Sequence, residues 1–285
     1  MRRRIIIAIL FLITLHSEGQ IINASQPYRP TWAASCSYLL DQYSGAVGAF
    51  ALNKLDCDYS GSAIRVRRSS DNSEQDIGFT SNGDLDTAAL KTFVSTNSGY
   101  VVTWYSQQGS VNGTQSTTTN QPRIVNAGVI ERQNTKPALY FDGNDFFSTT
   151  SFTFNQPTSC FLVGKNNGTN DLHFFDGNSG SRQLLGVSGG NLVSYAGSLL
   201  SFGANSTAFS LYSCVFNGSS STITRNGSGT VTGNAGTSAI GNPYIGKGQT
   251  GGIVGYISTF VIYNSDQTSN RTAIENIINN YYSIY

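Results

Sequence analysis

Charged side chains are scarce in this 285-residue chain, at 12% of all residues, whereas soluble domains average about 25%. The 17 lysines and arginines nearly balance the 16 aspartates and glutamates, and the net charge is +1. Such a sequence has no basic field to hold a phosphate backbone, so we expect no nucleic-acid partner. Glycine, serine, threonine and asparagine are abundant instead, a composition typical of extracellular β proteins with many turns.

An apolar segment long enough to span a bilayer is also missing, since such a span takes ~20 residues. Residues 5–15 are apolar, follow three arginines and precede small residues at 17 and 19, which is the pattern of a cleaved signal peptide. The alternative, a buried first strand, is disfavoured by the arginines. We therefore expect a signal peptide at 1–19, a linker at 20–35 and one domain at 36–285. The predicted protein is secreted or displayed on a cell or virion surface, and is not an integral membrane protein.

Histidine and methionine are nearly absent, because the mature chain would hold only His173 and no methionine. A Ser-His-Asp triad would have to use His173, and a zinc site with several histidines is excluded. Four cysteines lack Cys-x-x-Cys spacing, and their even number in an exported chain favours disulfides. Of the three possible pairings we favour Cys36–Cys57 with Cys160–Cys214. The alternative for the second pair is two buried free thiols.

Short β-branched and aromatic runs that end at Gly, Asn or Asp recur along the domain and predict strands. They include residues 64–68, 101–105, 138–141, 159–163, 172–175, 209–216, 221–225, 238–241 and 253–263. Intervals of ~8–12 residues between strands favour an antiparallel sandwich or jelly roll over a parallel sheet. The predicted fold class is therefore all-β, a two-sheet antiparallel jelly-roll sandwich.

Two helices are expected beside the strands. Asp86 can cap a short surface helix at 87–94. A C-terminal amphipathic helix is expected to start at Ser265 or Asp266, and Glu275 should be solvated on its outer side. Its apolar stripe has the spacing i, i+3, i+4 and i+7 and consists of Ile274, Ile277, Ile278 and Tyr281.

Four segments carry a resemblance to a known family: residues 64–78 (IRVRRSSDNSEQDIG), 103–109 (TWYSQQG), 136–146 (KPALYFDGNDF) and 255–264 (GYISTFVIYN). They resemble concanavalin A-like, laminin-G-type jelly-roll domains of the kind in bacterial surface proteins and in phage tail or virion proteins. The N-terminal third is also similar to the catalytic domain of family 54 α-L-arabinofuranosidases. The resemblance implies a jelly roll with Trp104 in its core.

The catalytic residues of that enzyme family do not carry over to this chain. Ser106 stands where family members have Asp, and the mature chain lacks both the Gly-His-Met-Glu stretch with the nucleophile and adjacent cysteines. A hydrolase would still need two carboxylates across the scissile bond, and the candidates are Asp142, Asp145 and Asp176. The alternative is turn chemistry, because Asp142 and Asp176 each precede Gly. Asp142, Asn144 and Asp145 are also candidate Ca²⁺ ligands, and no other cofactor is expected.

Arginines cluster at positions 65, 67 and 68. Strand alternation places Arg65 and Arg67 on one face of the sheet and Arg68 on the other. The acidic residues at 71, 74 and 76 favour internal ion pairs, which we prefer to an anion site.

Sugar recognition needs aromatic side chains and planar amides or carboxylates on a rigid sheet. The candidate ligand-binding residues are His173, Asp176, Tyr195 and Tyr244, and the alternative is that they belong to the core or the sheet surface. We predict a non-catalytic carbohydrate-binding or adhesion module whose partner is a glycan or a glycosylated surface. The alternatives are an arabinofuranosidase-like glycoside hydrolase and a structural virion or extracellular-matrix protein.

Overall fold

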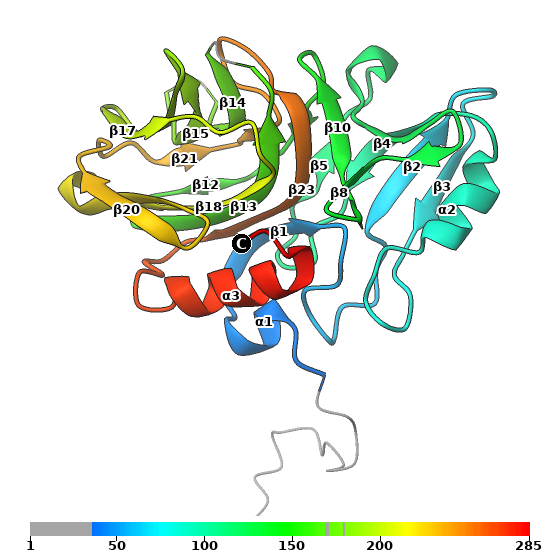
Figure 1. Ribbon diagram of the computed structural model, residues 1–285, viewed down its shortest axis with the longest axis horizontal. Helices are drawn as coiled ribbons and strands as arrows, with labels where there is room; N and C mark the ends of the chain where they lie inside the picture. Colours follow the sequence, from blue (N-terminus) through cyan, green and yellow to red (C-terminus); the bar gives the residue numbers. More distant parts are fainter. Residues whose placement is uncertain (1–35, 169–170, 179) are drawn as a thin grey trace, which may run out of the picture. The chain divides into compact units, whose positions relative to one another are not determined.

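The structure is a computed structural model that describes residues 36–168, 171–178 and 180–285 (Figure 1). Contacts divide the chain into Met1–Cys36 and Ser37–Tyr285, and the architecture given below is that of Ser37–Tyr285. The predicted signal peptide at 1–19 and linker at 20–35 lie outside the described residues.

The described part of the chain is almost entirely β-structure. Its strands are β1 (Ala46–Ala51), β2 (Ile64–Arg68), β3 (Glu74–Ile77), β4 (Gly99–Trp104), β5 (Gly113–Thr114), β6 (Arg123–Asn126), β7 (Val129–Ile130), β8 (Arg132–Gln133), β9 (Lys136–Pro137), β10 (Leu139–Asp142), β11 (Phe147–Ser148), β12 (Thr153–Phe154), β13 (Thr158–Asn166), β14 (Leu172–Asp176), β15 (Leu184–Ser188), β16 (Asn191–Tyr195), β17 (Leu199–Ala204), β18 (Ser210–Phe216), β19 (Ser221–Arg225), β20 (Ser228–Gly233), β21 (Ile240–Gly241), β22 (Tyr244–Ile245) and β23 (Val254–Tyr263). The helices are α1 (Leu39–Gln42), α2 (Thr87–Val94) and α3 (Arg271–Tyr282), with 3₁₀ turns η1 (Thr118–Asn120) and η2 (Gly218–Ser220).

Most strands form two antiparallel ladders, while β8 with β9 and β12 with β21 form separate pairs. The large ladder has the order β3–β2–β4–β6–β10–β23–β13–β18–β19–β20, with β7 beside β6 and β1 beside the C-terminal half of β23. The second ladder has the order β5–β11–β22–β14–β15–β16–β17. Because β5 also pairs with β4, hydrogen bonds join both ladders into one 19-stranded sheet. The all-β antiparallel prediction is confirmed, but the two layers are continuous with each other.

Strand β13 shows how the sequence sets the layers. Its side chains alternate between two apolar clusters, as the period of two requires. Cys160 and Leu162 join the main core, which also holds Phe174, Leu185 and other residues of the second ladder. Phe161 and Val163 point the opposite way, to the outer face of the large ladder. The main core therefore lies between the ladders, and it includes Trp104 as predicted.

Helix α3 covers part of that outer face (Figure 1). Ile274, Ile278 and Tyr282 are buried in the same cluster as Phe161 and Val163. A C-terminal amphipathic helix is thus confirmed, but it begins at Arg271 because residues 266–268 form a turn in which Asp266 Oδ1 accepts the Thr268 N–H at 2.8 Å.

The prediction that Glu275 is solvated was wrong. Glu275 is 1% exposed, because the stripe that packs on the sheet has the spacing i, i+4, i+8 and turns this side chain toward β18. Its carboxylate accepts hydrogen bonds from the Ser213 hydroxyl and from Arg271, each at 2.6 Å. The short helix α2 is confirmed, with Asp86 Oδ1 accepting the Ala89 N–H at 2.9 Å.

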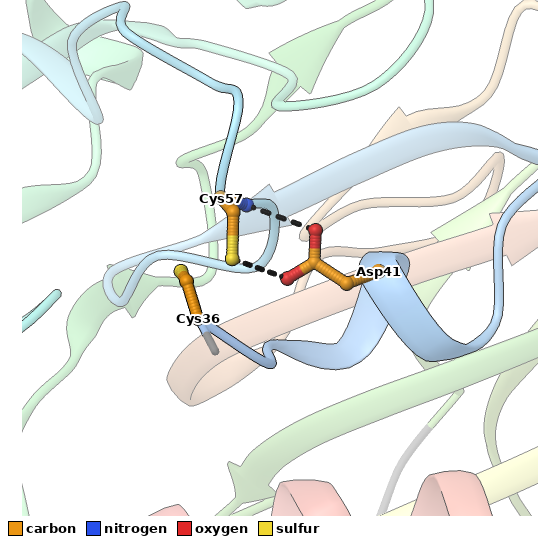
Figure 2. Close-up of side chains that lie close together, drawn as sticks. All are labelled: Cys36, Asp41 and Cys57. Carbon is orange, nitrogen blue, oxygen red and sulfur yellow. Dashed lines mark hydrogen bonds between the residues drawn. The ribbon is translucent and has the colours of Figure 1, made fainter. Parts of the chain in front are cut away.

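The four cysteines are in two different states. Cys36 and Cys57 are disulfide-bonded, and the carboxylate of Asp41 accepts the Cys57 N–H at 3.2 Å (Figure 2). Cys160 and Cys214 are directly opposite each other on β13 and β18, yet they are buried free thiols. The predicted second disulfide is therefore not formed. Burial raises the pKa of the Cys214 thiol, which suppresses the thiolate that oxidation requires.

Within the described part of the chain, no helix combines the length and the apolarity needed to cross a bilayer.

Candidate functional site

A row of arginine and tyrosine side chains crosses the outer face of the large ladder. It runs over five neighbouring strands through directly paired residues, namely Arg67, Tyr100, Arg123, Tyr140 and Tyr256. The row faces outward because a chain neighbour of each member belongs to the main core: Val66, Val101, Ile124, Phe141 and Ile257. We call these five residues the Arg–Tyr row.

Each arginine of the row lies over a tyrosine ring. The guanidinium carbon of Arg67 is 5.0 Å from the Tyr100 ring centroid, and that of Arg123 is 4.7 Å from the Tyr140 centroid. The Tyr140 and Tyr256 centroids follow at 5.3 Å. The row therefore presents guanidinium N–H and phenol O–H groups beside aromatic rings.

Glu131 fixes the row in place. Its Oε1 atom is 2.7 Å from Arg123 Nη2, and its Oε2 accepts the Tyr256 hydroxyl at 3.3 Å. One carboxylate therefore links two strands of the row and neutralises Arg123. The stacking and this ion pair restrict the side-chain rotamers, so the row is organised before any ligand arrives.

A cavity of about 370 Å³ lies against the row. Its lining includes every member of the row except Tyr256, together with Gln121, Asp142 and Asp145. A volume of this size is within the ~300–1,000 Å³ range of small-molecule sites. The cavity thus combines aromatic rings, guanidinium groups, an amide and two carboxyl groups.

The two carboxyl groups belong to one turn after β10. Asp145 Oδ2 accepts the Asp142 N–H at 3.0 Å, and Asp142 Oδ1 accepts the Asn144 N–H at 2.9 Å. Asp145 is 5% exposed, and its burial, together with the neighbouring charge of Asp142, raises its pKa to about 7. Below that pH, Asp145 is a neutral group that can donate a hydrogen bond. Ca²⁺ binding by Asp142, Asn144 and Asp145 stays a prediction.

Arg67 is 8% exposed and makes hydrogen bonds only to neutral partners within the described structure. Its Nε donates to Gln121 Oε1 at 2.7 Å and its Nη1 to Asn72 Oδ1 at 2.8 Å. Nη2 makes a longer bond of 3.4 Å to the Thr118 carbonyl. Among the described residues, no carboxylate lies within ion-pair distance of Arg67. Its positive charge is therefore buried without an opposite charge in contact.

The other two arginines of the cluster behave as predicted. Arg65 pairs with Asp76 at 2.8 Å, and Arg68 pairs with Asp71 at 2.6 Å. Arg67 is thus the exception within its own strand.

A second cavity, of about 540 Å³, adjoins the first, since Thr119 lines both. Its lining adds the side chains of Asn120, Asn144, Lys247 and Gln249. The Lys247 ammonium lies 4.2 Å from the Phe146 ring centroid and 5.8 Å from that of Tyr244. No carboxylate in the described part of the chain is within ion-pair distance of Lys247. The two adjoining cavities, which we call the groove, each contain one cation without an acidic partner.

The glycine-rich segment 246–252 forms a wall of the second cavity and packs closely on β14. A Cβ atom on Gly248 would lie 1.8 Å from His173 Nδ1 and 2.9 Å from Asp176 Oδ2. The Gln249 N–H donates to Asp176 Oδ2 at 3.2 Å, and Arg182 Nη2 approaches the same atom at 2.6 Å. Burial lowers the pKa of His173, so its neutral form is favoured. The side chains of His173 and Asp176 therefore contact the segment 246–252 and hold it in place.

The structure places the predicted site residues in different roles. Asp142 and Asp145 line the groove, but they also make the turn hydrogen bonds of the alternative interpretation. His173 is 5% exposed and Asp176 is 0% exposed, and neither lines the groove. Asp176 is also held by Arg182, which removes it from the carboxylates that could reach a ligand.

The two predicted tyrosines also have structural contacts. Tyr195 lies under Arg182, whose guanidinium carbon is 5.3 Å from its ring centroid. Tyr244 packs edge-on against Phe146 at 5.4 Å. Tyr244, on β22, therefore borders the groove through Lys247, and Tyr195 lies on β16, three strands away from β22.

Sequence reasoning missed the Arg–Tyr row, Gln121 and Lys247. A signal was present in part, because Arg67, Tyr100, Arg123 and Tyr140 each alternate with a core residue and must project outward. The pairing of their strands is not readable from the sequence.

Another cavity, of about 380 Å³, lies between α1 and α3. Two tyrosine hydroxyls in its lining are already engaged: Tyr281 donates to Asp84 Oδ1 at 2.7 Å, and Tyr282 bonds the Thr259 hydroxyl at 2.7 Å. Both hydroxyls are thus engaged within the protein, and we place the candidate site at the groove.

Comparison with known proteins gives a fold and no family. No family model matches the chain, and no curated protein matches it. Among solved structures, a mutant GH54 α-L-arabinofuranosidase soaked with 4-nitrophenyl α-L-arabinofuranoside is similar with a TM-score of 0.64 and 18% identity, over 84% of this chain and 64% of that chain. An arabinofuranosidase complexed with arabinofuranosyl-α-1,2-xylobiose has a TM-score of 0.59 and 16% identity over the same shares. A sialidase from Trypanosoma rangeli has a TM-score of 0.43 and 12% identity, over 63% of this chain and 31% of that chain.

At these identities the likeness to the arabinofuranosidases is one of fold. The chain spans 64% of the length of the arabinofuranosidase chains it matches. Carbohydrate-active enzymes are thus the structural neighbours of this β-domain.

Proposed function

We propose that this protein is an extracellular carbohydrate-binding module that holds an oligosaccharide in the groove without cleaving it. The observation that carries the proposal is the Arg–Tyr row beneath the first cavity. Its guanidinium and phenol edges, with Gln121 at the side, offer closely spaced donors and acceptors for sugar hydroxyl groups. Such polar groups on a rigid sheet are what a specific site for a small polar ligand requires.

The fold and the location support this proposal. We infer that the two ladders form a jelly roll of the concanavalin A-like type, because they enclose one core between them. The disulfide-bonded state of Cys36 and Cys57 favours an oxidising, extracellular compartment. The solved structures of similar fold are carbohydrate-active enzymes, one of them complexed with an arabinofuranosyl xylobiose.

The arrangement of carboxyl groups favours binding over hydrolysis. A glycosidase places two carboxylates on either side of the scissile bond, ~5–5.5 Å or ~6.5–9.5 Å apart. In the first cavity both carboxyl groups come from one turn, and each accepts a backbone N–H of that turn. They therefore lie on the same wall of the cavity. Glu131, the remaining acidic group at the row, is engaged by Arg123 and Tyr256.

A glycoside hydrolase is the second candidate, and one observation favours it. The pKa of Asp145, raised to about 7, is that of a general acid at neutral pH. This candidate predicts release of nitrophenol from 4-nitrophenyl α-L-arabinofuranoside by the wild-type protein, and its loss in Asp145→Asn.

A glycan array followed by calorimetry tests the proposal. The array should include xylo-, arabinoxylo- and galacturonan oligosaccharides, and mass spectrometry should find the retained ligand unchanged after incubation. We expect Tyr140→Ala to weaken binding at least about tenfold, equivalent to about 1.4 kcal/mol, because it opens the middle of the row. Thr222→Ala, on the distant strand β19, serves as the control. Binding to no glycan, or equal binding by Tyr140→Ala, would contradict the proposal.

A further inference from the structure

Two cations in the groove lack an acidic partner, although the chain provides such partners elsewhere. Arg65 and Arg68 each pair with an aspartate, whereas Arg67 between them does not. A buried charge is expensive unless an opposite charge or good hydrogen bonds compensate it. Neutral acceptors satisfy three of the five N–H groups of Arg67, and it lines the first cavity.

From these observations we propose that the groove binds an acidic oligosaccharide, with a uronate carboxylate at Arg67 in the first cavity and another at Lys247 in the second. This inference rests on the proposed glycan-binding function and names its ligand class. The planar fork of a guanidinium matches a carboxylate in geometry, and an ammonium attracts one as a point charge.

The position of Lys247 fits the same ligand. The Phe146 and Tyr244 rings lie against its ammonium. The other residues that line the second cavity are neutral, and besides glycines they are Thr119, Asn120, Asn144, Gln249 and Thr250. An anion there would meet one positive charge and several hydrogen-bond donors. Because Thr119 lines both cavities, a ligand with consecutive sugars can extend from one cation to the other.

The acidic side chains described at the first cavity are engaged by groups other than Arg67. Asp145 and Asp142 each accept a backbone N–H of their own turn. Glu131 is neutralised by Arg123 on β6. Asp142 is exposed to solvent, which screens its charge.

Calorimetry with a matched pair of ligands tests the proposal. The probes are tetragalacturonate and its fully methyl-esterified form, which keeps the sugar and removes the charge. At pH 6 we expect the acid to bind at least tenfold more tightly than the ester. Arg67→Gln should bring the ratio of the acid's affinity to the ester's affinity close to one. Lys247→Met should lower this ratio for the tetrasaccharide and leave the binding of monomeric galacturonate unchanged.

Control variants separate charge from folding. Arg65→Gln removes a neighbouring arginine that is exposed and already paired, and it should keep the full preference for the acid. If Arg67→Gln lowers the melting temperature strongly, Arg67→Lys replaces it as the test variant. This change keeps the charge without the planar fork of a guanidinium, and it should still reduce the ratio of acid affinity to ester affinity.

The outcomes distinguish the two proposals. Equal binding of acid and ester, or a neutral oligosaccharide as the tightest ligand, overturns the acidic class and leaves glycan binding standing. An acid preference that survives in both Arg67→Gln and Lys247→Met also overturns it. Failure of every glycan on the array to bind overturns the proposed function itself.

Discussion

The outer face of the large ladder has two halves with opposite chemistry. Under α3 it is apolar, with Phe161, Val163 and Val261 buried against the helix. Over β2, β4, β6 and β10 it carries the Arg–Tyr row and the first cavity. Both halves use the same alternation of side chains on the same sheet. The comparison shows that what covers a sheet face, and not the sheet itself, decides whether that face stabilises the fold or meets a ligand.

Strand β23 belongs to both halves, and a bulge makes this possible. Tyr256 is part of the row, and Val261 lies under α3, five positions later. Strict alternation would place two residues with odd spacing on opposite faces. The pairing of β23 with β13 shifts its register at Ser258. This bulge reverses the alternation of side chains along the strand, so both side chains face outward.

The largest expected effect is on the half that α3 covers. Ile274→Ala should lower the free energy of unfolding by about 2–5 kcal/mol, because Ile274 is completely buried between helix and sheet. Denaturant unfolding measures this loss, and glycan affinity should stay within twofold of wild type. A large loss of glycan affinity in a variant that remains folded would show that the two halves of the face are not independent.

A pH effect should mark the open half. The folded-state pKa of Asp145 is raised to about 7 from the usual 3.8, so the folded state holds its proton more tightly than the unfolded state does. Stability should therefore fall as the pH rises from about 4 to 7, by at most about 4 kcal/mol for this group. Asp145→Asn should flatten this part of the pH profile, measured by urea unfolding at a series of pH values. An unchanged slope in the variant would show that Asp145 titrates normally.

Gly248→Ala should give an intermediate effect on the wall of the second cavity. The added methyl group would meet the buried His173 ring, so the segment 246–252 must shift, at a cost of about 1–3 kcal/mol. We expect the substitution to weaken the binding of long oligosaccharides more than the binding of monosaccharides, as measured by calorimetry. Gly78→Ala is the matched control, because a Cβ there meets nothing within 4 Å. If both variants behave alike, the close packing on His173 has no part in shaping the groove.

The smallest effect should come from Arg65→Gln. Arg65 and Asp76 form an exposed pair, with side-chain exposures of 43% and 38%, and such pairs contribute about 0–1 kcal/mol. Thermal unfolding of this variant should nearly match wild type, in contrast to that of Arg67→Gln. A loss of thermal stability in Arg65→Gln as large as that in Arg67→Gln would show that burial does not distinguish the two arginines.

Local patterns gave part of the strands and both longer helices, because periodicity and capping are properties of neighbouring residues. The buried position of Trp104 followed from the family resemblance. Asp142 and Asp145 were also identified, since a turn after a strand is a local feature. The Arg–Tyr row depends on pairing among strands that lie far apart in the chain, such as those of Arg67 and Tyr100. Long-range pairing also decides that Arg67 meets Gln121 and no carboxylate.

The burial of Glu275 escaped prediction for a related reason. The pair with Arg271 has the local spacing i, i+4, but the helix gave no sign that Ser213, on β18, would donate to the same carboxylate and that the sheet would cover it. His173 and Asp176 were chosen for their chemistry, and the segment 246–252 that covers them comes from about 70 residues later in the chain.

Hydrogen exchange, measured with and without the oligosaccharide retained on the array, shows where that ligand binds. Bound ligand should slow exchange in β4, β6, the turn after β10 and residues 247–252, which together border the groove. We expect little change in α1 and α3. Slowed exchange confined to α1 and α3, with none at the groove, would contradict the groove as the ligand site.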